Sequence, residues 1–393
     1  MTIDQQVQQA FGAKARVEGP LAASGAGLSI SGVDLCTPLN PEQVTCLLDA
    51  LSQYRILSLP GQDLASFSLA RFERFANHWG APLPHPSNYK RDGELRPLEQ
   101  RVTASVNAAF PTELQCLPHE SPAVLIAANI RGHDTEADRQ ALTKVIEGGD
   151  CWHTDIEYEQ IPLWVSMFLA HKVPVSRNAP GGNWAPELTW DETQPTDPYI
   201  EGSSNELMRL RRQLPRNGET PFADTAAAFA ALSSTEQSRL SSVKVRRRTN
   251  ASDEGWLVPL VRTNPRSGIK SLHSPVWASR PRSRPPVEVH GMSAEASRAL
   301  LDELEAHVLQ PEFRYDHPHG PGDVTIWDLF MTLHSFPWLK GDVRTVDDVR
   351  LLYRISCKGE PSLTLPRSDP PEWIADHITS GYQTPMGMIE AEG

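Results

Sequence analysis

The segment CWHTD carries the residues whose types and spacing best suit metal binding. His153 and Asp155 are two residues apart, so on an extended segment both side chains leave the same face and can reach one ion. With 13 histidines and 49 acidic residues in 393, chance alone produces about one or two such pairs. A mononuclear ferrous site with open coordination positions needs two imidazoles and one carboxylate, so a second histidine must come from elsewhere in the chain.

The best candidate for that third ligand is His334. It follows GDVTIWD, a predicted strand, and sheets bring such distant segments together. The alternative is that His334 is a hydrogen-bonded polar residue in a turn. A rival pair, His317 and His319 in HPHG, is also two residues apart. Its Pro and Gly neighbours predict an exposed turn, which makes this pair the weaker candidate.

Two arginines downstream of His334 have the spacing of an anion-binding pair. Arg350 and Arg354 in VRLLYRIS are four residues apart, so on a strand they point the same way. Burying a charge without a partner is costly, and we therefore expect these arginines to meet anions. A dicarboxylate would engage one of them through a bidentate fork. The alternative is a pair of surface arginines on an edge strand.

Short strands and amphipathic helices must position these residues. Apolar alternation and capping signals, such as Asn40 followed by Pro41, predict the elements. The predicted helices are 40–54, 69–79, 223–240 and 295–308. The predicted strands are 27–35, 55–59, 163–170, 243–248, 257–262, 270–273, 323–327 and 349–356. Strands dominate the second half, and the chain shows no internal repeat.

Residues 176–217 are rich in Pro, Gly, Trp and polar residues, with little periodicity. A segment of this length within a compact chain is usually a functional lid or an insertion. Trp184, Trp190, Tyr199 and the run RLRRQLPR favour a lid with aromatic and cationic contacts; the alternative is a solvated surface loop.

Composition excludes several classes of protein. The 37 Lys and Arg against 49 Asp and Glu give a net charge of −12, which argues against a general nucleic-acid binder. No apolar run is long enough to cross a membrane, and the polar N-terminus lacks the pattern of a signal peptide. Five cysteines without CxxC spacing argue against a disulfide scaffold. We therefore expect a cytoplasmic protein that does not act at a membrane.

Six motifs in order give the chain a family resemblance. They are GLSISGVDL with the following LNPEQVTCLLDALSQYRILSLPGQ, WHTDIEYEQIP, GETPFADTAAAFAALS, PLVRTNPRSGIKSL, GDVTIWDLFMTLH and VRLLYRISCKGE. Over about residues 27–360 the chain resembles the TauD/TfdA family of iron(II)- and 2-oxoglutarate-dependent oxygenases.

The resemblance implies a mainly β fold with flanking helices, a double-stranded β-helix or jelly roll, formed by a single domain over 1–393. The segment 176–217 would be a lid insertion and 361–393 a C-terminal extension. The iron ligands would be His153, Asp155 and His334. The gap from HKVP to GETPFAD and the gap from His334 to Arg350 are both longer than in the family, so the substrate is not carried over.

Cofactor and substrate residues follow from the same resemblance. Thr220 and Arg350 would bind 2-oxoglutarate, and Arg354 would neutralise an anionic substrate. His85 and His273 are further candidates for substrate contact, although each is also explained as a structural residue. Trp152 and Trp327, beside the ligand motifs, are expected to be packing residues.

The implied reaction uses Fe(II), 2-oxoglutarate and O2 to oxidise a small, anionic organic substrate. It releases succinate and CO2, as enzymes of the EC 1.14.11 class do. Hydroxylation is the default outcome; desaturation, epoxidation or cyclisation needs only another placement of the substrate. Retention of Asp155 argues against halogenation. A zinc hydrolase and a non-catalytic β-helix binding protein are the weaker alternatives, and a homo-oligomer is compatible with the sequence.

Overall fold

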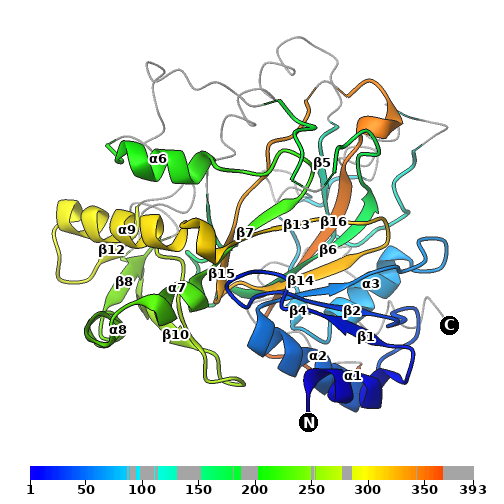
Figure 1. Cartoon of the computed structure of the whole chain (residues 1–393), viewed down its shortest axis with the longest axis horizontal. Coiled ribbons are helices and arrows are strands. Elements are labelled where there is room, and N and C mark those ends of the chain that lie inside the picture. The colour runs from blue at the N-terminus through cyan, green and yellow to red at the C-terminus, as the bar shows by residue number, and fades with distance from the viewer. Residues whose placement is uncertain are drawn as a thin grey trace.

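A large mixed sheet forms the centre of the molecule (Figure 1). The computed structural model describes residues 1–85, 88, 94–97, 110, 114–130, 152–179, 181–186, 202–248, 252, 254–276, 286–341 and 343–365. Among these, eight strands join in the order β1-β2-β3-β14-β6-β16-β4, with β5 also paired to β16. Their bounds are β1 Arg16–Glu18, β2 Leu28–Ser31, β3 Ile56–Leu59, β4 Ala81–Pro82, β5 Leu125–Ala128, β6 Leu163–Lys172, β14 Val324–Asp328 and β16 Leu351–Lys358.

A smaller antiparallel sheet carries part of the predicted site. It has the order β13-β7-β15, with bounds β13 Arg314–His317, β7 Thr220–Asp224 and β15 Thr332–His334. Aromatic side chains pack between the two sheets: the Trp327 ring lies 4.9 Å from Phe168 and 5.5 Å from Phe222, centroid to centroid. Two facing sheets with flanking helices confirm the predicted mainly β jelly-roll class.

Helices α1 Ile3–Phe11, α2 Pro41–Tyr54 and α3 Leu69–Ala76 flank the large sheet. The predicted start of α2 is confirmed. The Asn40 side chain accepts from the Gln43 amide, the Gln43 side chain accepts from the Asn40 amide, and Pro41 occupies the first turn. This reciprocal capping satisfies donors that would otherwise be left without partners. The apolar face of α2, including Leu47 and Leu51, is buried in the core.

A second group of elements lies beside the small sheet. The helices are α6 Asn205–Arg212, α7 Thr225–Ala231, α8 Ser234–Ser241 and α9 Ala294–Val308. The strands are β8 Lys244–Arg247, β9 Trp256–Pro259, β10 Val261–Thr263, β11 Lys270–Leu272 and β12 Glu288–Val289. Short 3-10 turns occupy Pro311–Phe313 and Val346–Asp348.

The prediction of one helix over 223–240 is wrong. Residues Thr220–Asp224 form strand β7, and two helices follow it. Asp224 caps the first helix through the amides of Ala226 and Ala227. Ser233 and Glu236 form a capping box that starts the second. Each cap interrupts what reads in the sequence as a continuous apolar period.

The predicted insertion is partly packed into the molecule. Helix α6 buries Leu207 and Leu210, and Arg211, fully buried, forms two 2.8 Å hydrogen bonds to the Glu305 carboxylate on α9. This part of 176–217 is therefore docked on the core, although the segment shows little periodicity in the sequence. Trp190 and Tyr199 lie outside the described residues.

No helix in the part of the chain described by the structure combines the length and apolar character needed to span a membrane.

Candidate active site

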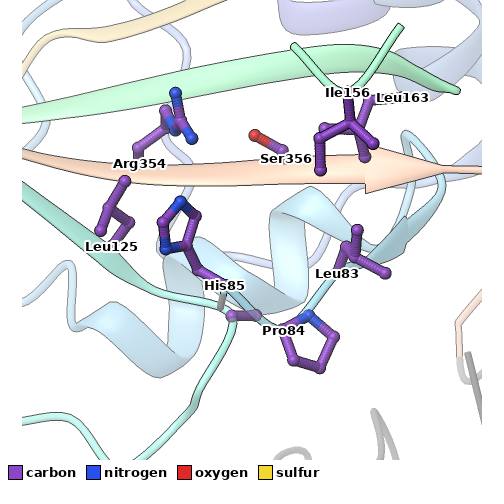
Figure 2. Close-up of a pocket in the computed structure, with 9 residues that line it drawn as sticks. Leu83, Pro84, His85, Leu125, Ile156, Leu163, Arg354 and Ser356 are labelled. Carbon is purple, nitrogen blue, oxygen red and sulfur yellow. The ribbon is translucent and has the colours of Figure 1, made fainter. Parts of the chain in front are cut away.

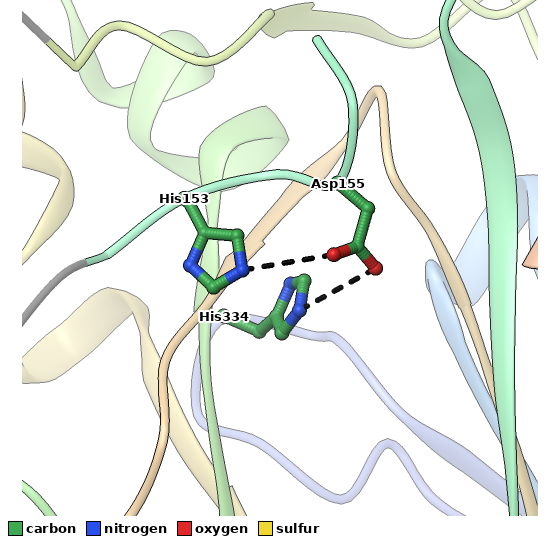
Figure 3. A group of neighbouring side chains, drawn as sticks. All are labelled: His153, Asp155 and His334. Carbon is green, nitrogen blue, oxygen red and sulfur yellow. Dashed lines mark ion pairs between the residues drawn. The ribbon is translucent and has the colours of Figure 1, made fainter. Parts of the chain in front are cut away.

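His153, Asp155 and His334 form a buried cluster (Figure 3). Their ligand atoms all lie within 4.8 Å of one another. The Nε2 atoms of His153 and His334 lie 3.6 and 3.7 Å from the Asp155 carboxylate oxygens. Two imidazole nitrogens and one carboxylate oxygen on one side of a small space fit a ferrous ion that keeps open positions. The structure thus brings together the three residues that the sequence nominated.

Backbone pairing fixes two of these side chains. The His153 amide donates to the His334 carbonyl, and the His334 amide donates to the His153 carbonyl, both at 2.9 Å. His153 therefore extends the small sheet beside β15, and the two rings lie 4.4 Å apart. The Thr154 hydroxyl donates to the Leu329 carbonyl at 2.6 Å. This bond ties the His-x-Asp segment to the loop that leads into β15.

The charge of Asp155 is stabilised by its neighbours. Burial alone would raise its pKa, but the guanidinium of Arg354 and the two imidazoles hold the pKa well below its usual value. Arg354 Nη1 donates to both carboxylate oxygens, at 3.1 and 3.3 Å. Ser166 Oγ donates to Oδ2 at 2.9 Å. Asp155 is therefore an ionised ligand whose orientation is fixed by strands β16 and β6.

Arg354→Met should weaken ferrous binding because it removes the cation that orients Asp155. Partners of metal ligands typically contribute about 10–100-fold to metal affinity, and we expect a loss in that range. Ser166→Ala, which removes one neutral hydrogen bond from the same carboxylate, is the matched control and should have a smaller effect. Anaerobic iron titration of the metal-free protein measures both. Equal affinities in wild type and Arg354→Met would contradict this role.

Arg350 and Thr220 form a second buried group. Arg350 Nε donates to the Gly218 carbonyl at 2.9 Å, and Nη2 donates to Thr220 Oγ1 at 3.0 Å. Burial lowers the pKa of Arg350 to about 10, so the guanidinium stays charged. Thr220 lies two residues before Phe222, which is paired with His334 across β7 and β15. Two strand residues span about 7 Å. The distance between this cationic group and the metal cluster therefore matches the length of a small dicarboxylate.

His317 and His319 are buried, and the predicted exposed turn is wrong. They are 3% and 1% exposed, because His317 ends strand β13 and both rings lie between the two sheets. The Thr220 hydroxyl lies 2.7 Å from His319 Nε2, and Thr325 Oγ1 lies 3.0 Å from His317 Nε2. Both histidines thus serve a buried hydrogen-bond chain that ends at Arg350, and neither belongs to the metal cluster.

Because His317 is buried in its neutral form, the free energy of unfolding should decrease as the pH is lowered. Burial lowers the pKa of His317 from 6.5 to about 4. Between these two pH values this histidine is protonated in the unfolded chain but neutral in the folded chain. The contribution is full above pH 6.5 and is lost as the pH falls toward 4. Between pH 7 and pH 5 this one group should remove about 2 kcal/mol from the free energy of unfolding.

The matched variant for this test is His317→Gln, which keeps a hydrogen-bonding side chain but does not titrate. Urea unfolding of both proteins at pH 7 and pH 5 gives the difference. A comparison is needed because burial raises the pKa of Glu73 and of Asp328 to about 7, and these groups favour the folded state in acid. An equal pH dependence in the two proteins would show that His317 does not titrate as stated.

Arg354 also faces a narrow hollow next to the cluster (Figure 2). Its lining includes His85, Leu125, Ile156 and Ser356. The space measures about 10 Å³, which admits about one water molecule. Ile156 has a φ of 54°, a strained value for a β-branched residue, directly after Asp155. His85 and Arg354 therefore line the same hollow.

His273 does not line this hollow. It is 1% exposed and lies next to Phe330, with 5.1 Å between ring centroids. Trp152 and Trp327 are fully buried, in agreement with the packing role predicted for them.

Several residues of the site gave no signal in the sequence. Ser166 reaches Asp155 from strand β6, His319 reaches Thr220, and the side-chain Oδ1 of Asn129 accepts from the Arg350 amide at 2.8 Å. His319 and Asn129 are far in sequence from their partners, and all three residue types are common at structural positions. Only the strand pairing reveals them.

Comparison with known proteins finds a family model that matches part of the chain. Residues 206–352 match the model of the "Taurine catabolism dioxygenase TauD, TfdA family". The chain is similar to pentalenolactone F synthase of Streptomyces arenae, at 32% identity over 138 residues, covering 30% of this chain and 46% of that protein. A longer match, 23% identical over 290 residues, is to the (S)-phenoxypropionate/alpha-ketoglutarate-dioxygenase of Sphingobium herbicidovorans and covers 67% of this chain and 81% of that protein.

The match thus spans about half the length of the first of these relatives. Solved structures agree in fold. A taurine dioxygenase from Burkholderia xenovorans superposes with a TM-score of 0.52 at 21% identity, covering 88% of this chain and 90% of that one. AAD-2 in complex with Mn(II) and N-oxalylglycine superposes with a TM-score of 0.53 at 21% identity, covering 88% and 99%.

Two of the three clustered residues, His153 and Asp155, lie outside the segment matched by the family model, and the tertiary structure joins them to His334 inside it. The order of the motifs, the jelly-roll fold and the match of residues 206–352 to the family model agree, and the chain is similar to members of the TauD/TfdA family.

Proposed function

We propose that this protein is an Fe(II)- and 2-oxoglutarate-dependent dioxygenase that oxidises a small, anionic organic substrate. One observation carries the proposal: a buried cluster of two histidines and one aspartate lies about two strand residues along the small sheet from Thr220, whose hydroxyl accepts a hydrogen bond from the buried Arg350. The first group suits ferrous iron, and the second suits the distal carboxylate of a dicarboxylate.

Each residue has a separate task in this proposal. His153, Asp155 and His334 would hold the iron, and Arg354 with Ser166 keeps Asp155 ionised and oriented. Arg350 would fork onto the distal carboxylate of 2-oxoglutarate, and the Thr220 hydroxyl would donate a further hydrogen bond. When bound, the iron and 2-oxoglutarate supply oxidative decarboxylation with O2, which yields succinate, CO2 and an oxidant for a substrate C–H bond.

Anaerobic titration with Fe(II) and then 2-oxoglutarate tests the reaction class. The proposed enzyme develops a metal-to-ligand charge-transfer band that depends on both additions. A zinc hydrolase or a binding protein gives no such band, and its absence from folded, iron-loaded protein would refute the proposal. Product analysis then separates hydroxylation from desaturation, epoxidation or cyclisation.

The relatives suggest the kind of substrate to test first. One acts, by its name, on phenoxypropionate, and another, from Cupriavidus pinatubonensis, on 2,4-dichlorophenoxyacetate. We therefore propose organic acids as the substrate class, with His85 and Arg354 beside the substrate. A cytoplasmic location and a homo-oligomer remain part of the proposal, as does a single domain with a lid within 176–217 and a C-terminal extension.

A further inference from the structure

A second buried group of cationic and polar side chains lies apart from the metal cluster. Arg247, at the end of β8, is 1% exposed. Its Nη2 donates to the carbonyls of His273 and Ser274, both at 3.1 Å. Its Nε and Nη1 have no hydrogen-bond partner in the structure. A buried guanidinium with two unused donors is costly unless an acceptor reaches it.

Three further buried polar atoms without partners belong to the two residues whose carbonyls contact Arg247. Both ring nitrogens of His273 and the hydroxyl of Ser274 lack hydrogen-bond partners, and these residues are 1% and 2% exposed. Arg262 contributes a buried Nε without a partner, and its guanidinium lies over the Phe330 ring at 4.3 Å. The charges of Arg247 and Arg262 reinforce burial in lowering the pKa of His273 well below its usual value.

The nearby acidic residues, Glu157 and Asp328, do not form ion pairs with these two arginines. Glu157 acts electrostatically on Arg247, and Asp328 on Arg262, but within the described part of the chain neither arginine forms an ion pair. Asp328 instead accepts from the Phe330 and Met331 amides and from the Asn264 amide group. The remaining atoms are therefore mostly donors carried by two cations, and such a set selects an anion rather than a metal ion.

The backbone is strained at the same place. Ser274 has a φ of 46°, a conformation that non-glycine residues rarely adopt and that often marks a ligand site. At this turn the carbonyls of His273 and Ser274 both accept from Arg247.

The group also borders the segments that carry the metal cluster. Glu157 is two residues beyond Asp155, and Phe330, which contacts both Arg262 and His273, lies on the loop before His334.

We infer that Arg247, Arg262, His273 and Ser274 form a buried binding site for an oxyanion of the carboxylate or sulfate class. Its source is the anionic end of an organic acid or a free inorganic anion, and both present the same acceptor oxygens. The inference rests on the proposed function only where the organic acid is taken to be the substrate.

The test measures anion binding to the metal-free protein. Sodium sulfate is titrated at constant ionic strength against wild type, Arg247→Met and Arg262→Met, and the melting temperature is followed. Arg246→Met is the matched control: it lies one residue earlier on β8, and its Nη1 donates outward to the exposed Glu254 carbonyl. Sulfate stabilises most proteins weakly through exclusion from the surface, and the control cancels this general effect.

Wild type and Arg246→Met should show saturable stabilisation by sulfate. Arg247→Met should lower the apparent affinity by roughly tenfold or more, because it removes charged hydrogen bonds to the anion, and Arg262→Met should lower it as well. The inference is overturned if both of these variants respond to sulfate as Arg246→Met does. A change in the melting temperature without sulfate does not affect this comparison, because the measured quantity is how the melting temperature of each variant depends on the sulfate concentration.

Phenoxyacetate and uncharged phenoxyethanol then identify the source. Phenoxyacetate that competes with sulfate, while phenoxyethanol does not, assigns the site to an organic acid. Sulfate binding that phenoxyacetate leaves unchanged assigns it to an inorganic anion. Both results support an oxyanion site. Because iron and 2-oxoglutarate are absent from this experiment, its outcome is independent of the charge-transfer titration that tests the proposed function.

Discussion

His334→Ala should abolish iron binding and succinate release while leaving the fold in place. Changing a partner of a metal ligand already costs about 10–100-fold, so loss of a ligand should reduce turnover by more than about 100-fold. The fold should survive because the backbone bonds between His153 and His334 do not involve the imidazole, and the surrounding core is apolar. Iron titration, succinate release and melting temperature are the measurements.

His307→Ala provides the matched control. His307 Nε2 forms a hydrogen bond with the Ala228 carbonyl and is not a member of the metal cluster, so the variant should retain iron and turnover. His153→Ala and Asp155→Ala should behave as His334→Ala does, although the aspartate variant also leaves Arg354 without its partner and should be less stable. Coupled turnover by any of the three, with iron supplied, would refute the ligand assignment.

Arg350→Ala should raise the requirement for 2-oxoglutarate by about 100-fold or more. A hydrogen bond to a charged group contributes about 1.5–3 kcal/mol, and a fork supplies two. Lysine at this position should restore only part of the affinity, because an ammonium group lacks the planar fork. The charge-transfer band gives the affinity directly, under anaerobic conditions and with iron saturating.

The control for this prediction is Arg266→Ala, which removes an exposed guanidinium paired with Asp49. It should leave the affinity for 2-oxoglutarate unchanged, since surface pairs contribute little. An unchanged affinity in folded Arg350→Ala would show that the register is misassigned and that Arg354 or Arg344 meets the co-substrate instead.

The elements whose signals are local were predicted best. The helix at 41–54 begins at its cap, and the strands at 56–59 and 163–172 match their apolar runs. The prediction of one long helix over 223–240 was wrong because the helical period continues through two capping sites. Strand β7 forms because it pairs with β13 and β15, which the local sequence does not show. Helix α6 went unpredicted because the buried ion pair of Arg211 with Glu305 joins residues far apart in sequence.

The properties of the site also divide into those that local sequence predicts and those that depend on the tertiary structure. The sequence alone determined that His153 and Asp155 could share an ion, that His334 ended a strand, and that Arg350 and Arg354 would seek anions, because residue type and strand period are local properties. Only the tertiary structure decided what each residue meets: Arg354 pairs with Asp155, while Arg350 bonds to Thr220. The burial of His317 and His319 and the gathering of Arg247 with His273 depend on sheet packing and strand register, which no local pattern encodes.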